Sequence, residues 1–209
     1  MPACSAARRG ITLVARAACI GALALLFSAS AAPLEIVPRT AWKAKAPDAK
    51  LMKQQEPRSI VIHHTSVRQQ PNVSLERKMQ GLQSFSRVPG KVGSNPKPAW
   101  GDVPYHFYVD ARGRVAEGRD LSFAGDSNTK YDLKDRIQVV LEGDFDREEP
   151  SAQQLAALQE LLTMLSAKYK ISTQKITGHN DHAATDCPGK NLKRHFQNLR
   201  KAVAAAAPK

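Results

Sequence analysis

One short stretch of the sequence, residues 179–189, collects side chains that bind transition metals. It contains His179, His182 and Cys187, and a Pro-Gly pair ends it, which is typical of a loop. Imidazole nitrogen and thiolate sulfur are the ligands that zinc prefers in proteins. One imidazole and one thiolate from this stretch do not complete a site, so a third donor has to come from elsewhere in the chain.

The best candidates for the third donor are two adjacent histidines, His63 and His64, which end the apolar run of residues 60–62. Neighbouring side chains on a strand point to opposite faces of the sheet, so regular geometry allows only one of them to face a metal. Local spacing does not say which one. Three protein ligands leave a fourth position open, which is the arrangement of catalytic zinc sites.

Other assignments of these residues stay open at this point. His179 and His182 form a His-x-x-His pair that could bind a metal by itself. We interpret His64 and His106 as packed or hydrogen-bonded strand histidines. A buried Cys187 without any ligand role is the alternative to a metal site.

Residues 1–31 have the order of a secretory signal peptide. Three arginines precede an apolar run at residues 17–27, and a small-residue cleavage site follows at residues 29–31. The run is shorter than the roughly 20 residues that a spanning helix needs, although an uncleaved anchor is the alternative. We therefore expect export to the periplasm or the cell exterior, a mature chain beginning near Ala32, and no stable membrane insertion after cleavage.

Cleavage changes both the cysteine count and the charge. Cys4 and Cys19 leave with the signal, so Cys187 remains as a lone thiol that should be buried or ligated in an oxidising compartment. The whole chain has 31 basic and 19 acidic residues, and removal of three arginines leaves 28 against 19, or +9. This charge favours a polyanionic partner such as cell wall or an anionic membrane face. A nucleic-acid partner is disfavoured because no nucleic-acid motif is recognisable.

The strands that must position the candidate ligands follow from apolar patterning. The continuous apolar run at residues 60–62 predicts a buried strand over residues 59–64, residues 137–141 predict another buried strand, and residues 34–37 predict a short edge strand. Residues 175–178 predict a short strand that delivers His179.

A hairpin is predicted over residues 100–117, with its turn at residues 110–113. Alternation along its first strand predicts that Tyr105, Phe107 and Val109 share one face.

Three helices are predicted. The first begins at Asn72 or Ser74 and runs to about residue 85, the second spans residues 151–169 behind a capping box, and the last begins near residue 192. The Gly- and Pro-rich stretch 87–97 predicts a mobile basic loop.

Together these elements predict a single α/β domain with a central mixed sheet flanked by helices. Its bounds are residues 58–204, after a lead-in segment at residues 32–57, and we expect a monomer.

Four stretches, in this order, resemble the zinc-dependent N-acetylmuramoyl-L-alanine amidases and the related peptidoglycan recognition proteins. The resemblance covers roughly residues 36–199, and each piece alone is weak. The four stretches are residues 36–42 (IVPRTAW), 61–65 (VIHHT), 100–107 continuing to 117–119 (WGDVPYHF and EGR), and 178–189 (GHNDHAATDCPG).

The resemblance implies a zinc ion in a surface groove, with His63, His179 and Cys187 as ligands. It also implies that Tyr105 and Thr185 assist catalysis at the reacting centre. The implied reaction is hydrolysis of the amide between the lactyl group of N-acetylmuramic acid and L-alanine, in peptidoglycan or muropeptides. The alternative is a non-catalytic peptidoglycan-binding protein of the same fold; such relatives typically lack the cysteine ligand.

Overall fold

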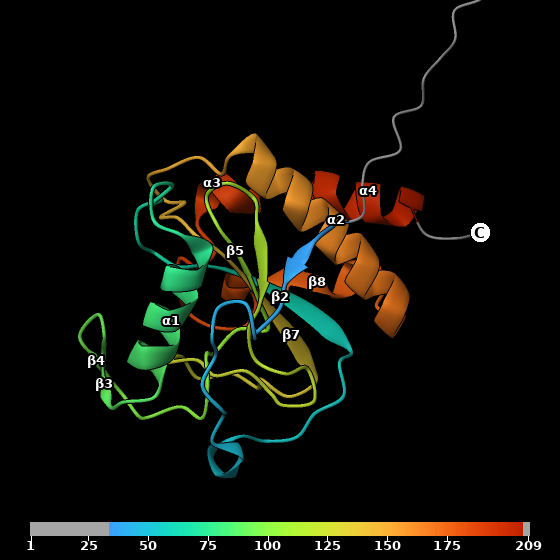
Figure 1. Cartoon of the computed structure of the whole chain (residues 1–209). Helices are drawn as coiled ribbons and strands as arrows, with labels where there is room; N and C mark the ends of the chain where they lie inside the picture. Colours follow the sequence, from blue (N-terminus) through green and yellow to red (C-terminus); the bar gives the residue numbers. More distant parts are fainter. Residues whose placement is uncertain (1–33, 207–209) are drawn as a thin grey trace, which may run out of the picture. The chain divides into compact units, whose positions relative to one another are not determined.

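The computed structural model describes residues 34–206 and places one six-stranded mixed sheet at the centre of this part of the chain (Figure 1). The strand order is β1-β6-β5-β7-β2-β8, and β5 and β6 form an antiparallel hairpin while the other neighbours run parallel. The mixed sheet and the predicted hairpin are confirmed. The strands are β1 (Ile36–Val37), β2 (Ser59–His64), β5 (Phe107–Val109), β6 (Val115–Glu117), β7 (Arg136–Leu141) and β8 (Ile176–Gly178).

Helices cover both faces of this sheet. Ser74 caps α1 by accepting a hydrogen bond from the Arg77 N–H, and Ser151 with Gln154 forms the predicted capping box of α2. Among residues 34–206, no helix has the length and apolarity that crossing a membrane requires. The helices are α1 (Leu75–Ser86), α2 (Ala152–Tyr169), α3 (Lys190–Lys193) and α4 (Phe196–Ala206), with short 3-10 turns at Ala49–Leu51, Thr173–Lys175 and His179–Asp181.

Two apolar clusters hold these layers together. The larger packs α2 and α4 on one face of the sheet, and the smaller packs α1 on the other face. Each fully buried leucine or isoleucine contributes about 1.5–3 kcal/mol relative to an exposed one. Because Val61, Ile62 and His63 alternate along β2, Ile62 enters the larger cluster while His63 faces the α1 side with Val140 of β7.

The described part of the lead-in segment, residues 34–57, packs against the sheet and the α1 side of the core. Ile36 and Val37 pair in parallel with β6 at the sheet edge, as predicted. Trp42 is fully buried on the α1 side, and its indole N–H donates to the Glu117 carbonyl at 2.8 Å. The predicted signal peptide and the first residues after it lie outside the described residues.

The stretch predicted as a mobile basic loop is a hairpin, so that prediction is wrong. Strands β3 (Gly90–Val92) and β4 (Asn95–Lys97) pair in antiparallel fashion. Lys97, which favoured a solvated loop, is buried instead. Its ammonium group donates to three backbone carbonyls and lies over two aromatic rings, and these contacts offset the cost of burying the charge.

The predicted alternation through Tyr105 is also wrong. Strand β5 begins only at Phe107, and residues 101–106 follow an irregular path. Phe107 and Val109 therefore enter the cluster under α2, whereas Tyr105 packs on the α1 side. This break in periodicity puts Tyr105 on the same face as His63.

A buried ion pair ties α1 to the end of β7. The Lys78 ammonium lies 2.7 Å from the Glu142 carboxylate, which also accepts the backbone N–H groups of Gln70 and Ala111. Replacing Glu142 with alanine leaves a buried ammonium and two N–H groups without their acceptor. We expect a loss of about 3–5 kcal/mol in the free energy of unfolding, measured by urea denaturation.

The matched control is Glu149→Ala, because Glu149 pairs with Arg194 where both side chains are 57% exposed. That change should cost no more than about 1 kcal/mol. Equal losses in the two variants would contradict a structural role for the buried pair.

Candidate metal centre

Two histidines meet at the carboxyl ends of neighbouring parallel strands. The register of β2 and β8 pairs Ile62 with Gly178, and His63 and His179 are the next residue in each chain segment. Their ring centroids lie 4.6 Å apart. The continuous apolar run before His63 buries β2 between two neighbours, which fixes where the first imidazole stands.

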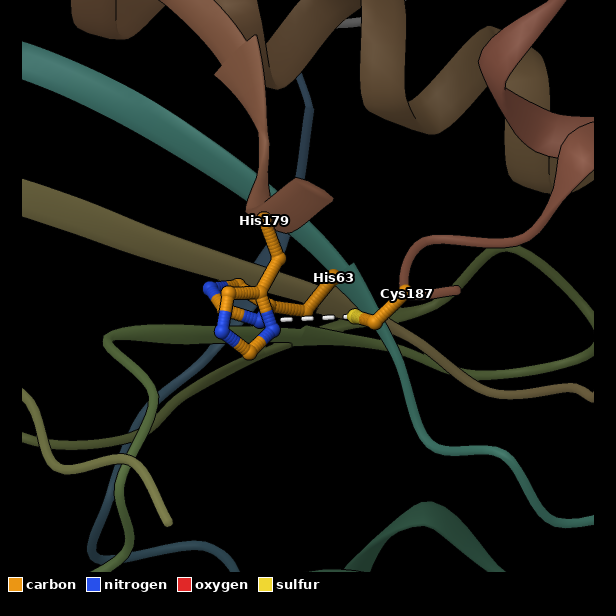
Figure 2. A group of neighbouring side chains, drawn as sticks. All are labelled: His63, His179 and Cys187. Atoms are coloured by element: carbon orange, nitrogen blue, oxygen red, sulfur yellow. Dashed lines mark hydrogen bonds between the residues drawn. The ribbon is translucent and has the colours of Figure 1, made fainter. Parts of the chain in front are cut away.

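Cys187 returns to the two histidines through the loop that follows β8. The Asn180 N–H donates to the Cys187 carbonyl at 2.8 Å, which fastens the two ends of this loop together. The Cys187 Sγ then lies 3.6 Å from Nδ1 of His63 (Figure 2). One potential ligand atom from each of His63, His179 and Cys187 lies within 4.8 Å of the others. The structure thus brings together the three residues that the sequence singled out.

The rival histidines are engaged elsewhere. Both ring nitrogens of His64 contact other groups. Its Nδ1 accepts the Phe145 N–H, and its Nε2 lies 2.8 Å from the Ser66 hydroxyl. His182 hydrogen-bonds the Thr177 hydroxyl at 2.8 Å and is not part of the three-residue cluster.

His106 is hydrogen-bonded, as interpreted from the sequence, but it lies just before β5 and not in a strand. Its Nδ1 accepts the Gln138 N–H, and its Nε2 donates to the Phe123 carbonyl. Both ring nitrogens are therefore occupied by protein groups.

The donor set fits a zinc ion. Nε2 of His63 lies 2.5 Å from Oε1 of Gln138, and Nε2 of His179 lies 2.6 Å from the Thr129 hydroxyl. When each Nε2 carries the proton and donates it, both Nδ1 atoms keep a free lone pair for a cation. Two imidazoles and one thiolate from a buried cluster are a ligand set typical of zinc with an open position.

Protonation of the three donors is set mainly by burial. Burial, followed by the neighbouring His179, lowers the pKa of His63 to about 3. Burial and the nearby His182 lower the pKa of His179 to about 4. Burial raises the pKa of the Cys187 thiol to about 12, against the opposing effect of the His64 N–H that points at its sulfur. At neutral pH the metal-free protein therefore holds two neutral imidazoles and one protonated thiol.

Zinc binding at pH 6 is expected to release about one proton per ion, because the Cys187 thiol must ionise while both imidazoles are already neutral. Isothermal titration calorimetry in buffers of different ionisation enthalpy measures this proton count. The Cys187→Ala protein serves as control and should release none from this position. Zinc binding without proton transfer to the buffer would contradict a thiol ligand that starts protonated.

Tyr105 and Thr185 flank the cluster. The centroids of the Tyr105 and His63 rings lie 5.3 Å apart. Burial raises the pKa of the Tyr105 phenol well above its ordinary value, so the phenol stays protonated. The Thr185 hydroxyl oxygen accepts the Cys187 N–H at 3.2 Å. Both side chains are half-buried, so each is partly accessible from outside.

Sequence reasoning missed Thr129, Tyr131 and Gln138, which contact the two histidines or their partners. One signal was available for Gln138, because it is a polar residue between the apolar residues of β7. The structure leaves it 1% exposed. Thr129 and Tyr131 carry no comparable signal, because they lie in an irregular polar stretch.

Two surface cavities, of about 470 and 570 Å³, lie away from these residues. The first is lined by residues such as Arg39, Gln55 and Lys168, and the second by residues beside β1. Neither is lined by one of the three donors, so the groove predicted around the metal stays a prediction.

Comparison with known proteins identifies a family. The family model described as N-acetylmuramoyl-L-alanine amidase matches residues 53–190. Peptidoglycan-recognition protein SD of Drosophila melanogaster is 29% identical over 164 residues, which cover 75% of this chain and 81% of that protein.

Solved structures agree with this match. The crystal structure of Drosophila peptidoglycan recognition protein SD superposes with a TM-score of 0.64 at 28% identity, covering 78% of this chain and 94% of that one. Peptidoglycan recognition protein LE in complex with tracheal cytotoxin, a monomeric diaminopimelic acid-type peptidoglycan, gives 0.63 at 26%, covering 78% and 92%. N-acetylmuramoyl-L-alanine amidase LysC from Clostridium intestinale shares the fold, with a TM-score of 0.59 at 23% identity and coverage of 81% and 97%.

Proposed function

This chain belongs to the N-acetylmuramoyl-L-alanine amidase family, and from that premise we propose that it is a zinc-dependent amidase. The proposed reaction is hydrolysis of the amide between the lactyl group of N-acetylmuramic acid and L-alanine. The observation that carries the proposal is the buried cluster of His63, His179 and Cys187, whose geometry and donor types suit a zinc ion with an open position.

The roles of the chain's own residues follow from this cluster. His63, His179 and Cys187 would hold the metal. A bound zinc supplies a Lewis acid that polarises a carbonyl oxygen and makes hydroxide available near neutral pH. The protonated Tyr105 phenol donates a hydrogen bond to the amide oxygen as negative charge develops on it. Thr185 accepts the Cys187 N–H through its oxygen and keeps its own proton free to donate to the substrate carbonyl.

Peptidoglycan or a muropeptide is the proposed substrate. The similarity to a recognition protein in complex with a diaminopimelic acid-type muropeptide supports this ligand class. We further propose that the protein is exported and that its mature form begins near Ala32, because residues 1–31 have the pattern of a signal peptide. We also propose that it acts as a monomer.

The second candidate is a peptidoglycan-binding protein without hydrolytic activity. The names of the similar recognition proteins support that reading. The complete donor set favours hydrolysis, since binding alone does not need a thiolate and two imidazoles converging on one point.

Mass spectrometry of digested peptidoglycan tests the proposal. The zinc-loaded protein should release peptides with a free L-alanine amino terminus and leave the sugar chains intact, and a chelator should stop this release. Shortened stems still attached to sugar would indicate a peptidase, and new reducing ends a glycosidase. Retention of intact muropeptide without any product would favour the binding protein.

A further inference from the structure

Gln138 occupies an unusual place for a glutamine. It lies within β7, pairs with Val61 of β2, and is 1% exposed. Parallel register puts its side chain on the same face as His63, two residue pairs back along the strands. His106 binds both backbone groups of Gln138. The His106 backbone N–H donates to the Gln138 backbone carbonyl, and the His106 Nδ1 accepts the Gln138 backbone N–H.

The side-chain amide oxygen of Gln138 faces two hydrogen-bond donors. Nε2 of His63 lies 2.5 Å from it, and the Tyr131 hydroxyl donates to it at 3.1 Å. The amide nitrogen of the same side chain is buried and has no hydrogen-bond partner within residues 34–206. An unpaired buried donor is unfavourable. In this arrangement the side-chain oxygen of Gln138, and not the nitrogen, faces Nε2 of His63 and the Tyr131 hydroxyl.

The contact between the Gln138 side-chain oxygen and Nε2 of His63 determines which tautomer His63 adopts. A carbonyl oxygen facing Nε2 requires the proton on Nε2, which leaves Nδ1 free on the side of the ring that faces Cys187 (Figure 2). The reversed amide would donate to Nε2 and move the ring proton to Nδ1. That tautomer cannot offer Nδ1 to a cation.

The second histidine has its hydrogen-bond partner in the loop of residues 127–131. The Thr129 hydroxyl lies 2.6 Å from Nε2 of His179 and 2.9 Å from the Ser127 hydroxyl. If Thr129 accepts from His179 it can donate to Ser127, so the chain of hydrogen bonds has a consistent direction. Tyr131, two residues further on, stands 5.0 Å from the His179 ring while its hydroxyl reaches Gln138.

We propose that Thr129, Tyr131 and Gln138 form an imidazole clamp that fixes both histidines with the proton on Nε2 and Nδ1 toward the metal position. The clamp acts through positioning and does not touch substrate. The inference rests on the zinc site of the proposed function, but it concerns how this chain prepares its ligands before metal arrives. Replacing a hydrogen-bond partner of a metal-bound histidine typically weakens metal binding by about 10–100-fold.

The test uses long-range ¹H–¹⁵N correlation spectra of the metal-free mature protein, together with zinc competition titrations. In the wild type, His63 and His179 should both show the Nε2–H tautomer. Gln138→Leu should release His63 into a mixture of tautomers and weaken zinc binding by about 10–100-fold. Gln138→Glu keeps a carboxyl oxygen against His63 and should retain the tautomer and most of the affinity.

Gln83→Leu is the matched control, because Gln83 is 3% exposed and bonds Asp102 and the backbone of Lys45, not the metal cluster. It should change neither the tautomers nor the zinc affinity. Thr129→Val, which keeps the side-chain shape, should release the His179 tautomer alone and tests the clamp even if Gln138→Leu does not fold. An Nδ1–H tautomer of His63 in the wild type, or unchanged tautomers in both clamp variants, would overturn the proposal. None of these readouts requires hydrolysis, so a failure of the amidase assay is distinguishable from a failure of the clamp.

Discussion

Replacing Cys187 with alanine is expected to remove stoichiometric zinc from the mature protein and to lower amidase turnover by on the order of a thousandfold or more. A catalytic zinc typically supplies several kcal/mol of transition-state stabilisation, and each 1.4 kcal/mol or so is a tenfold change in rate. The thiol sits 3.6 Å from Nδ1 of His63, so its loss leaves two imidazoles to hold the ion. Metal analysis of the purified variant measures the zinc content, and muropeptide hydrolysis measures the turnover.

The matched control for this variant is His182→Ala. His182 is also a potential ligand in the same loop, but it bonds Thr177 and lies outside the cluster. It should keep its zinc. Full zinc retention in Cys187→Ala, or zinc loss only in His182→Ala, would show that the ligand set is wrong.

Replacing Tyr105 with phenylalanine should lower turnover by on the order of a hundredfold while zinc content stays at the wild-type level. Loss of one donor to a developing oxyanion typically costs about that much. The ring can remain beside His63, since only the hydroxyl is removed. Steady-state kinetics on a purified muropeptide, with parallel metal analysis, separates the effect on chemistry from an effect on metal binding.

Tyr108→Phe is the control for that measurement. Tyr108 lies in β5, is 6% exposed and packs in the same cluster against α1, so it tests the loss of a buried phenol on that face. Its turnover should stay close to that of the wild type. If Tyr105→Phe is as active as this control, Tyr105 is a packing residue and another donor must serve the oxyanion.

Much of the frame that carries the site was predictable from the sequence. Mostly apolar residues marked β2 and β7, because strands buried on both faces need no polar alternation. Local chemistry marked α2, whose Ser151 and Gln154 cap each other. The three metal donors could be named from the sequence, because their residue types and their order in the chain resemble one family. The structure places one potential ligand atom of each within 4.8 Å of the others.

The remaining features depend on contacts between residues far apart in the chain. Gln138 is 75 residues from His63, so nothing local assigns its carbonyl to that ring. Lys97 and the glycines around it suggested a solvated loop, yet three carbonyls and two aromatic rings bury the ammonium and order the hairpin. Tyr105 fits a strand pattern by spacing, but the backbone is irregular up to Phe107 and turns it to the face of His63.

The most direct test of the central claim is X-ray absorption spectroscopy at the zinc edge of the metal-loaded mature protein. The account predicts one sulfur ligand at about 2.3 Å, with two imidazole nitrogens and one further light atom at about 2.0–2.1 Å. In Cys187→Ala the sulfur shell should disappear. A wild-type spectrum without sulfur, or one that needs three or more imidazoles, would contradict a site built from His63, His179 and Cys187.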